Sequence, residues 1–274
     1  GSFISTGNEA IRDSRYAFRR HFYQHAGFRY ISSDMPVETE DNLYEDDPAI
    51  VPWCDLDWES SFATDMLERI KKHLGNGQKA LHMGCKTGRL SFEMAKYYDH
   101  VTGIDFTARI IQLATRMKEA GYIRYQQVEE GEITSVAEHS LAESKLQDFA
   151  AKVEFWQADS SNLAPKFNGY DLILAVNTLE EAMNPLRFIS MIHQRLNSRG
   201  ILILADSYLW QSANPPAGIR KAGEPYRALD WLTEQLAPHF ELLDLPRELR
   251  QDIRHSKRNY HSKILQVSVW QKKD

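Results

Sequence analysis

The residues ALHMGCKTGR, at positions 80–89, read as a buried strand that runs into a glycine turn and then into a helix. Gly84 and Gly88 would let the backbone approach a ligand closely, because glycine has no Cβ and tolerates positive φ. The first amides of a helix that begins near Arg89 would favour a carboxylate or a phosphate. The turn therefore predicts a site for a nucleotide-like cofactor, with Cys85 and Lys86 between its two glycines.

Two better-known glycine motifs do not describe this turn. A phosphate-binding P-loop has a glycine just before its lysine and another five residues earlier, but here those positions hold Cys85 and Ala80. A dinucleotide fingerprint has a second glycine two positions after the first, where this chain has Lys86. The glycine pair alone thus leaves the kind of cofactor open.

Around this turn, short apolar runs alternate with stretches of helical periodicity. This pattern predicts an α/β, Rossmann-like fold, in which a mostly parallel seven-stranded sheet carries helices on both faces. The last two strands, at 240–246 and 264–270, are expected to add to the sheet edge in antiparallel orientation. The other expected strands lie at 79–83, 100–105, 152–159, 170–176 and 200–207, and the expected helices at 60–74, 89–98, 108–121 and 185–196.

Composition excludes several classes of protein. The 274 residues carry a net charge of −5, which argues against a nucleic-acid partner, since such proteins present a basic surface. Two cysteines make no disulfide framework, and no His/Cys cluster has the spacing of a metal site. The apolar runs are too short to cross a membrane, and no signal peptide is visible, so a cytoplasmic protein is expected. The one basic cluster, 250–263, favours a pocket for a small anion.

In open α/β sheets, ligands bind beyond the carboxyl ends of the strands. Asp105 ends the second expected strand, next to Phe106, and can accept hydrogen bonds from both hydroxyls of a ribose. The alternative for Asp105 is a helix N-cap, a role that Thr107 fits better. Asp159 ends the third strand beside Ser160 and can accept from an adenine amino group, or it can simply form a turn.

The fourth and fifth strands also end in polar groups. Asn177 and Glu180 follow the fourth strand and would face the reacting end of the ligand, although Asn177 or Thr178 could equally cap a helix. Tyr208 follows the fifth strand and could form a wall for a flat substrate, or pack at the edge of the sheet. Taken in order, the glycine turn, the two acids and this polar strand end match the spacing of an S-adenosyl-L-methionine site.

Several longer stretches carry a family resemblance. They are GRLSFEMA (88–95), VTGIDFTARIIQ (101–112), EEGE (129–132), VEFWQADSSNL (153–163) and the closing IRHSKRNYHSKILQVSVW (253–270). With them, residues 76–274 resemble the C-terminal methyltransferase domain of ovothiol synthases, which is similar to class I methyltransferases generally. Residues 1–33 resemble the tail of the sulfoxide-synthase domain, akin to formylglycine-generating enzymes, that precedes it.

The resemblance implies three segments. They are a sulfoxide-synthase tail at 1–33, a linker or lid at 34–57, and an S-adenosylmethionine-dependent methyltransferase domain at 58–274. The implied reaction is N-methylation of the imidazole ring of 5-thiohistidine, the final step of ovothiol biosynthesis. The implied partners are this small substrate and the upstream domain of the same polypeptide.

This hypothesis gives each candidate residue a role. Arg254 and Arg258 would bind the substrate carboxylate, since a guanidinium pairs with it in bidentate fashion, although both could instead lie on a solvated hairpin. Tyr260 would contact the same end of the substrate, and Glu180 the substrate ring. Asn177 and Tyr208 are the catalytic candidates. The cofactor-binding candidates are Gly84, Cys85, Lys86, Gly88, Asp105, Phe106, Asp159, Ser160 and Asn177.

Some positions depart from the family pattern. His82 stands where the family has an aspartate, and His255 stands where it has a glutamate. The segment TLEEAMNP (178–185) lacks an expected arginine and tyrosine. These departures leave two alternatives: a class I methyltransferase that acts on another small histidine or selenium analogue, or a catalytically weak or inactive domain that supports the sulfoxide-synthase domain.

Overall fold

The computed structural model describes residues 49–50, 58, 61–75, 77–209, 220–221 and 224–274. The chain divides into a larger unit, made of Asp57–Tyr122, Ser140–Asp252 and Ser262–Asp274, and a smaller unit, made of Gly1–Leu56, Ile123–His139 and Ile253–His261. Apart from Ala49–Ile50, the predicted tail (1–33) and linker (34–57) lie outside the described residues. Their boundaries therefore stay predictions.

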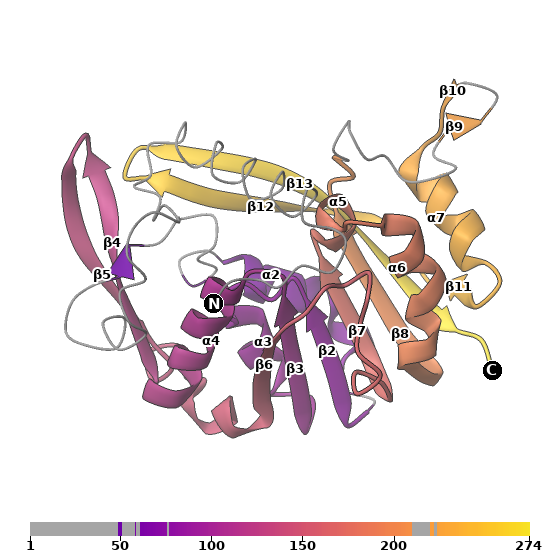
Figure 1. Ribbon diagram of the computed structural model, residues 1–274, viewed down its shortest axis with the longest axis horizontal. Coiled ribbons are helices and arrows are strands. Elements are labelled where there is room, and N and C mark those ends of the chain that lie inside the picture. Colours follow the sequence, from indigo (N-terminus) through magenta and orange to yellow (C-terminus); the bar gives the residue numbers. More distant parts are fainter. Residues whose placement is uncertain (1–48, 51–57, 59–60, 76, 210–219, 222–223) are drawn as a thin grey trace. The chain divides into compact units, whose positions relative to one another are not determined.

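One sheet forms the centre of the larger unit, with the strand order β11-β13-β8-β7-β2-β3-β6 (Figure 1). Strands β6, β3, β2, β7 and β8 are parallel, and β13 runs antiparallel to both of its neighbours, β8 and β11. The predicted Rossmann-like fold is thereby confirmed, but among the described residues the sheet has eight strands rather than the predicted seven. The bounds are β2 Lys79–Met83, β3 His100–Asp105, β6 Val153–Gln157, β7 Tyr170–Val176, β8 Leu196–Asp206, β11 Phe240–Leu242, β12 Arg247–Ser256, which pairs with β13, and β13 Asn259–Lys272.

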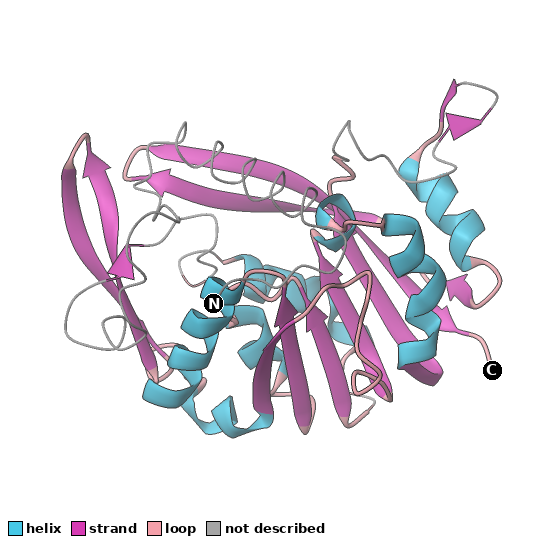
Figure 2. Ribbon diagram, in the orientation of Figure 1, coloured by secondary structure: helices cyan, strands magenta, loops and turns pink. Residues whose placement is uncertain are grey.

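Helices flank this sheet (Figure 2). Helices α6 and α7 cover one face, because their Phe188 and Trp231 join a buried cluster with Leu81, Ile173 and Leu202 of the strands. The helices are α2 Phe62–Ile70, α3 Arg89–Met94, α4 Ala108–Ala120, α5 Thr178–Glu181, α6 Pro185–Met191 and α7 Ala228–Leu236, with 3₁₀ turns η3 Lys71–His73, η4 Gln147–Lys152 and η5 Ile192–Arg195. The short strands β9 Arg220–Lys221 and β10 Glu224–Pro225 pair with each other.

Strand β2 is buried on both faces, as expected for a central strand of a parallel sheet. Because side chains alternate along a strand, Leu81 and Met83 join the α6–α7 cluster while His82 points to the other face. There the His82 ring contacts Ser91 of α3, with 2.7 Å between Nδ1 and Oγ. His82 therefore lies in the interface between the sheet and α3.

The smaller unit contains a three-stranded sheet in the order β1-β4-β5, in which β1 is parallel to β4. Its strands are β1 Ala49–Ile50, β4 Tyr122–Glu130 and β5 Ile133–Ser140. Tyr125 of β4 and His139 of β5 stack and share a hydrogen bond of 2.7 Å. Glu129 and Glu130 pair with Lys257 and Arg258 at the turn that joins β12 to β13.

The strands expected at 79–83, 100–105 and 170–176 have the predicted bounds. Helix α3 ends at Met94 rather than at 98, because the chain tightens there into bonds between residues three apart, such as Lys96 N to Glu93 O. Strand β8 begins at Leu196 rather than at 200. Helix α7 and the β4–β5 hairpin were not predicted. Within the described residues, no helix has the length and apolar character needed to cross a membrane.

Candidate active site

The glycine turn joins β2 to α3 and is held against the end of β3. The backbone amides of Gly84 and Cys85 both donate to the carbonyl of Ile104, over 2.9 and 3.0 Å. The amide of Gly88 donates to the Cys85 carbonyl over 3.0 Å, which closes the turn. The Cys85 side chain is fully buried and its Sγ donates to the Lys86 carbonyl at 3.5 Å. Hydrogen bonds within the chain thus fix the shape of the turn.

Both glycines of the turn are required by close packing. Each has a positive φ, +72° at Gly84 and +97° at Gly88. A Cβ on Gly84 would lie 2.4 Å from the carbonyl oxygen of Val176, and one on Gly88 would lie 2.5 Å from the ring of Phe155. The chain itself occupies the space that these glycines open. The proposal that they also admit a ligand stays a prediction.

Asp105, at the end of β3, joins the glycine turn to the start of α4. Its Oδ2 accepts from the Lys86 amide at 3.2 Å, and its Oδ1 accepts from the Thr107 amide at 3.1 Å. Lys86 reaches Asp105 because it adopts the left-handed conformation, with φ +50°, at the position where a fingerprint has glycine. Each carboxylate oxygen can accept a second hydrogen bond. Asp105 is therefore still able to accept from ligand hydroxyls.

His82 is a neutral, buried residue beneath the turn. It is 2 % exposed, and burial lowers the pKa of its ring to about 3. Its Nε2 has no hydrogen-bond partner among the described residues. His82 therefore places no positive charge beneath the turn.

A second turn, at the end of β7, abuts the glycine turn. Asn177 is buried with a φ of +54°, and its amide donates to the Ala205 carbonyl at 2.8 Å. The side chain is held at both ends: its Nδ2 donates to Gln251 Oε1 at 3.1 Å, and its Oδ1 accepts from Lys263 Nζ at 3.2 Å. The neighbouring Thr178 hydroxyl would lie 3.5 Å from a Cβ on Gly84. The ends of β2 and β7 are thus in direct contact.

Glu180 of α5 forms an ion pair with Lys263 of β13 and accepts a hydrogen bond from the Ser207 hydroxyl. The Glu180 side chain is 7 % exposed and that of Lys263 is 21 % exposed. Sequence reasoning missed Lys263, Ser207 and Gln251. The signal for Lys263 and Gln251 was present, because both lie in the basic cluster 250–263 that predicted an anion pocket.

The Asp206 carboxylate fixes the backbone of this second turn by hydrogen bonds. Its Oδ2 accepts from the amides of Leu179 and Glu180, at 2.9 and 3.3 Å, and its Oδ1 accepts from the Tyr208 amide at 2.8 Å. Burial, and then the charge of Glu180, raise the pKa of Asp206. The hydroxyl of Tyr208 donates to Gln266 Oε1 at 2.8 Å, and burial raises the pKa of Tyr208. Tyr208 therefore stays protonated and lies beside β13.

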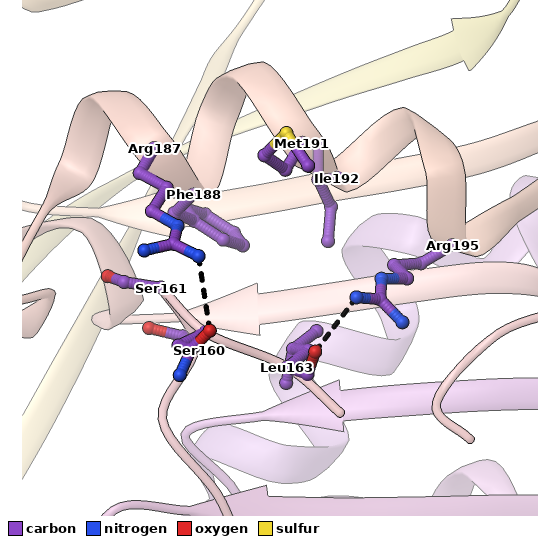
Figure 3. A pocket seen from close by; sticks show the side chains of 9 residues that line it. Ser160, Ser161, Leu163, Arg187, Phe188, Met191, Ile192 and Arg195 are labelled. Carbon is purple, nitrogen blue, oxygen red and sulfur yellow. Dashed lines mark hydrogen bonds between the residues drawn. The ribbon is translucent and has the colours of Figure 1, made fainter. Parts of the chain in front are cut away.

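Asp159 and Ser160 lie in the loop after β6. The Asp159 carboxylate accepts from the Ser161 amide at 2.9 Å, so the turn alternative considered for this residue does occur. Ser160 lines a hollow of about 40 Å³ against α6 and η5 (Figure 3). Arg187 closes one side of the hollow by donating to Asn162 Oδ1 at 3.1 Å. The contacts of Asp159 and Ser160 with an adenine ring stay predictions.

The candidates for binding the substrate carboxylate belong to the smaller unit. Arg258 donates to Glu130 at 2.7 Å, and its side chain is 69 % exposed. Arg254 Nε donates to the Ser256 carbonyl at 3.1 Å, and Tyr260 is exposed. Their substrate contacts stay predictions.

Taken together, the larger unit brings the glycine turn, Asp105 and Asn177 to one edge of its sheet. Phe106 lies in the same loop, where its carbonyl accepts from Gln157 at 3.0 Å. Within the described residues, no three His, Cys, Asp or Glu side chains are grouped so as to hold a metal ion. A Rossmann-like sheet with such an edge is typical of proteins that bind a nucleoside-containing cofactor.

The fold and the site are those of a Rossmann-like protein, and comparison with known proteins gives the family. Residues 74–270 match the family described as a methyltransferase domain, which covers more than half of the chain. The chain therefore belongs to the methyltransferase domain family, which confirms the predicted enzyme class. No curated protein matches the chain.

The fold is shared with a solved structure, and two further solved structures are similar to the chain. A protein studied for the conversion of a disulfide bond into a thioacetal group during echinomycin biosynthesis is 14 % identical, with a TM-score of 0.52 over 81 % of this chain and 85 % of that chain. An S-adenosylmethionine-dependent methyltransferase from Methanosarcina mazei is 20 % identical, with a TM-score of 0.48 over 75 % and 97 %. The N-methyltransferase NodS from Bradyrhizobium japonicum, solved with S-adenosyl-L-homocysteine, is 13 % identical, with a TM-score of 0.48 over 86 % and 97 %.

Proposed function

We propose that this methyltransferase uses S-adenosyl-L-methionine to methylate a ring nitrogen of 5-thiohistidine, as the final step of ovothiol biosynthesis. The observation that carries the cofactor assignment is the meeting of the Gly84–Gly88 turn, Asp105 and Asn177 at one edge of the parallel sheet. The family match supports the reaction class. The resemblance of residues 76–274 to ovothiol synthases supports the substrate.

The described residues fit this cofactor. Asp105 keeps acceptor capacity for two ribose hydroxyls while its other lone pairs hold the Lys86 and Thr107 amides. Neutral His82 leaves the cationic cofactor without a buried like charge beneath the turn. The ammonium group of Lys86 is a suitable partner for the methionine carboxylate, and Asp159 and Ser160 are the candidates for the adenine end.

S-adenosylmethionine supplies a sulfonium methyl group, which is a strong electrophile. The chain must mainly align the nucleophilic nitrogen with this methyl group, which is catalysis by proximity. The imidazole must be neutral at the attacking nitrogen, and at pH 7 much of it is. An acceptor for the N–H of the other ring nitrogen would fix the tautomer. Asn177 Oδ1 and the Glu180 carboxylate are suitable acceptors. The Tyr208 hydroxyl already donates to Gln266, so it is a further suitable acceptor.

The proposal also covers the setting of the domain. The resemblance of residues 1–33 to the end of a sulfoxide-synthase domain supports an upstream partner domain in the same polypeptide. The protein would act in the cytoplasm on a substrate of the thiohistidine class. Both statements rest on the sequence, since residues 1–33 lie outside the described part of the chain.

One assay tests the proposed reaction. The protein is incubated with methyl-labelled S-adenosylmethionine and a panel that contains 5-thiohistidine, its selenium analogue and histidine. Mass spectrometry should find the label on a ring nitrogen of 5-thiohistidine. Transfer to another member of the panel alone would assign a different substrate. If S-adenosylhomocysteine does not bind in calorimetry, the cofactor assignment itself is wrong.

A further inference from the structure

The Lys263–Glu180 ion pair lies beside Asn177, and the proposed function does not use its two charges together. Lys263 reaches it from β13, and Glu180 from the first turn of α5. Lys263 also donates to Asn177 at 3.2 Å, so the pair adjoins the candidate catalytic amide. We infer that this ion pair binds the α-carboxylate and the α-ammonium of an amino-acid substrate. The inference rests on the proposed methyltransferase function.

Both partners keep capacity for a ligand. An ammonium has three donors, and among the described residues Lys263 uses two of them, to Glu180 and Asn177. A carboxylate accepts about four hydrogen bonds, and Glu180 accepts from Lys263 and Ser207. The pair can therefore donate once more from Lys263 and accept again at Glu180, without losing an existing bond.

Charge balance favours a zwitterion. The pair is already largely withdrawn from water, so the cost of desolvating its two charges is met when the protein folds. A ligand with one charge would leave that charge partly uncompensated at this site. An amino acid brings one charge of each sign, so its carboxylate can face Lys263 and its ammonium can face Glu180. The net charge of the site then stays unchanged.

The nearby Asp206 is not a competing acceptor for the ammonium. Its carboxylate accepts from three backbone amides and is 1 % exposed. Arg258, the sequence-based candidate for the carboxylate, is exposed and paired with Glu130. Exposed ion pairs of this kind are well hydrated, and their attraction contributes little free energy. Lys263 is the candidate cation within the larger unit, because it donates to Asn177.

The test measures binding in the presence of S-adenosylhomocysteine by calorimetry, using three probes. They are 5-thiohistidine, its decarboxylated amine and its α-N-acetyl derivative. Lys263→Met should weaken binding of 5-thiohistidine and of the acetylated acid by about 10- to 100-fold, the loss expected for one charge-assisted hydrogen bond. It should leave binding of the amine nearly unchanged. Glu180→Gln should weaken 5-thiohistidine and the amine, and spare the acetylated acid.

Lys72→Met is the matched control, since Lys72 forms a comparable but exposed pair with Asp244. It should change no affinity. Equal losses for all three probes in both site variants would overturn the inference and assign the pair a structural role. If S-adenosylhomocysteine fails to bind the wild type, the proposed function falls. The three probes can then be measured without S-adenosylhomocysteine. If Lys263→Met still weakens only the two acids and Glu180→Gln only the two amines, the ion pair remains supported as an amino-acid site.

Discussion

The Lys86 amide donates to the Asp105 carboxylate at 3.2 Å, and this bond joins the first two strand ends of the candidate site. It forms because Lys86 takes a left-handed conformation at a position that usually needs glycine. The turn can therefore hold lysine instead of glycine at position 86, because the Lys86 backbone adopts a positive φ. Asp105 becomes the residue on which both the turn and the proposed ribose contact depend.

Replacing Asp105 with alanine should therefore reduce the affinity for S-adenosylhomocysteine by about 100-fold or more, because two charge-assisted hydrogen bonds are lost. Isothermal titration calorimetry measures the effect. Asp171→Ala is the matched control: at the start of β7, Asp171 accepts from the Gln78 and Lys79 amides at 2.7 and 3.0 Å. Both variants should lose stability, but only Asp105→Ala should lose binding. Equal affinities in the two variants would refute the ribose role.

His82 should make stability depend on pH. Its pKa is about 3 in the folded protein against 6.5 for the free side chain, so the unfolded chain binds a proton first as the pH falls. This contribution to stability is complete above the unfolded value and is lost as the pH falls from 6.5 towards 3. Between about pH 7.5 and pH 5, it should lower the free energy of unfolding by about 2 kcal/mol.

His82→Gln provides the comparison, since a neutral amide can still bond to Ser91 but does not titrate. Urea denaturation of both proteins at the two pH values isolates the contribution of His82 to the change in the free energy of unfolding. The loss on acidification should be smaller in the variant by the amount stated above. If both proteins lose the same free energy of unfolding on acidification, folding does not lower the pKa of His82.

Gly84→Ala should destabilise the protein more than Gly121→Ala does. Both glycines have left-handed φ values, +72° and +82°, so alanine costs about 1–2 kcal/mol at either position for conformation alone. Only at Gly84 does the new methyl group meet a neighbour, the Val176 carbonyl at 2.4 Å, whereas Gly121 has nothing within 4 Å. Thermal unfolding should show a further loss of about 1–3 kcal/mol for Gly84→Ala. Equal losses would argue against the close contact of β2 and β7.

Tyr208 should not act as a general base. Burial and the neighbouring Asp206 charge raise the pKa of its hydroxyl, so the phenolate is scarce at neutral pH. Tyr208→Phe should lower the rate of methyl transfer without changing the shape of the pH–rate profile between about pH 7 and 9. A limb in the wild-type profile that disappears in the variant would instead identify the tyrosine as the titrating group.

Periodicity predicted the central sheet well, because β2, β3 and β7 are buried along most of their length and read as short, mainly apolar runs. It missed the β4–β5 hairpin, whose strands in the smaller unit carry mixed polar and apolar side chains. Helix α3 proved shorter than predicted, since a helical pattern of apolar residues continues through the tighter turns that follow Met94. Patterns of this kind indicate which face is buried rather than where a helix ends.

For the site, strand ends were the useful guide, and they led to Gly84, Asp105 and Asn177. The same guide led to Asp159, whose carboxylate serves its own turn. It did not lead to Lys263, because this residue lies near the beginning of its strand. A lysine in a basic segment also carries no sign of its partner, since the ion pair with Glu180 joins residues 83 apart in sequence. Only the fold brings them together.

The antiparallel direction of β13 has a consequence for how the protein can vary. Its pairing with β8 sets Val269 opposite Ile203 and Trp270 opposite Leu202, and the same register fixes the face on which Lys263 emerges. A shift of one residue would turn Lys263 to the opposite face and also expel Trp270 from the core. An insertion or a deletion within β13 would therefore disturb both the core and the Lys263–Glu180 ion pair. Changes in the length of the β12–β13 turn leave this register intact.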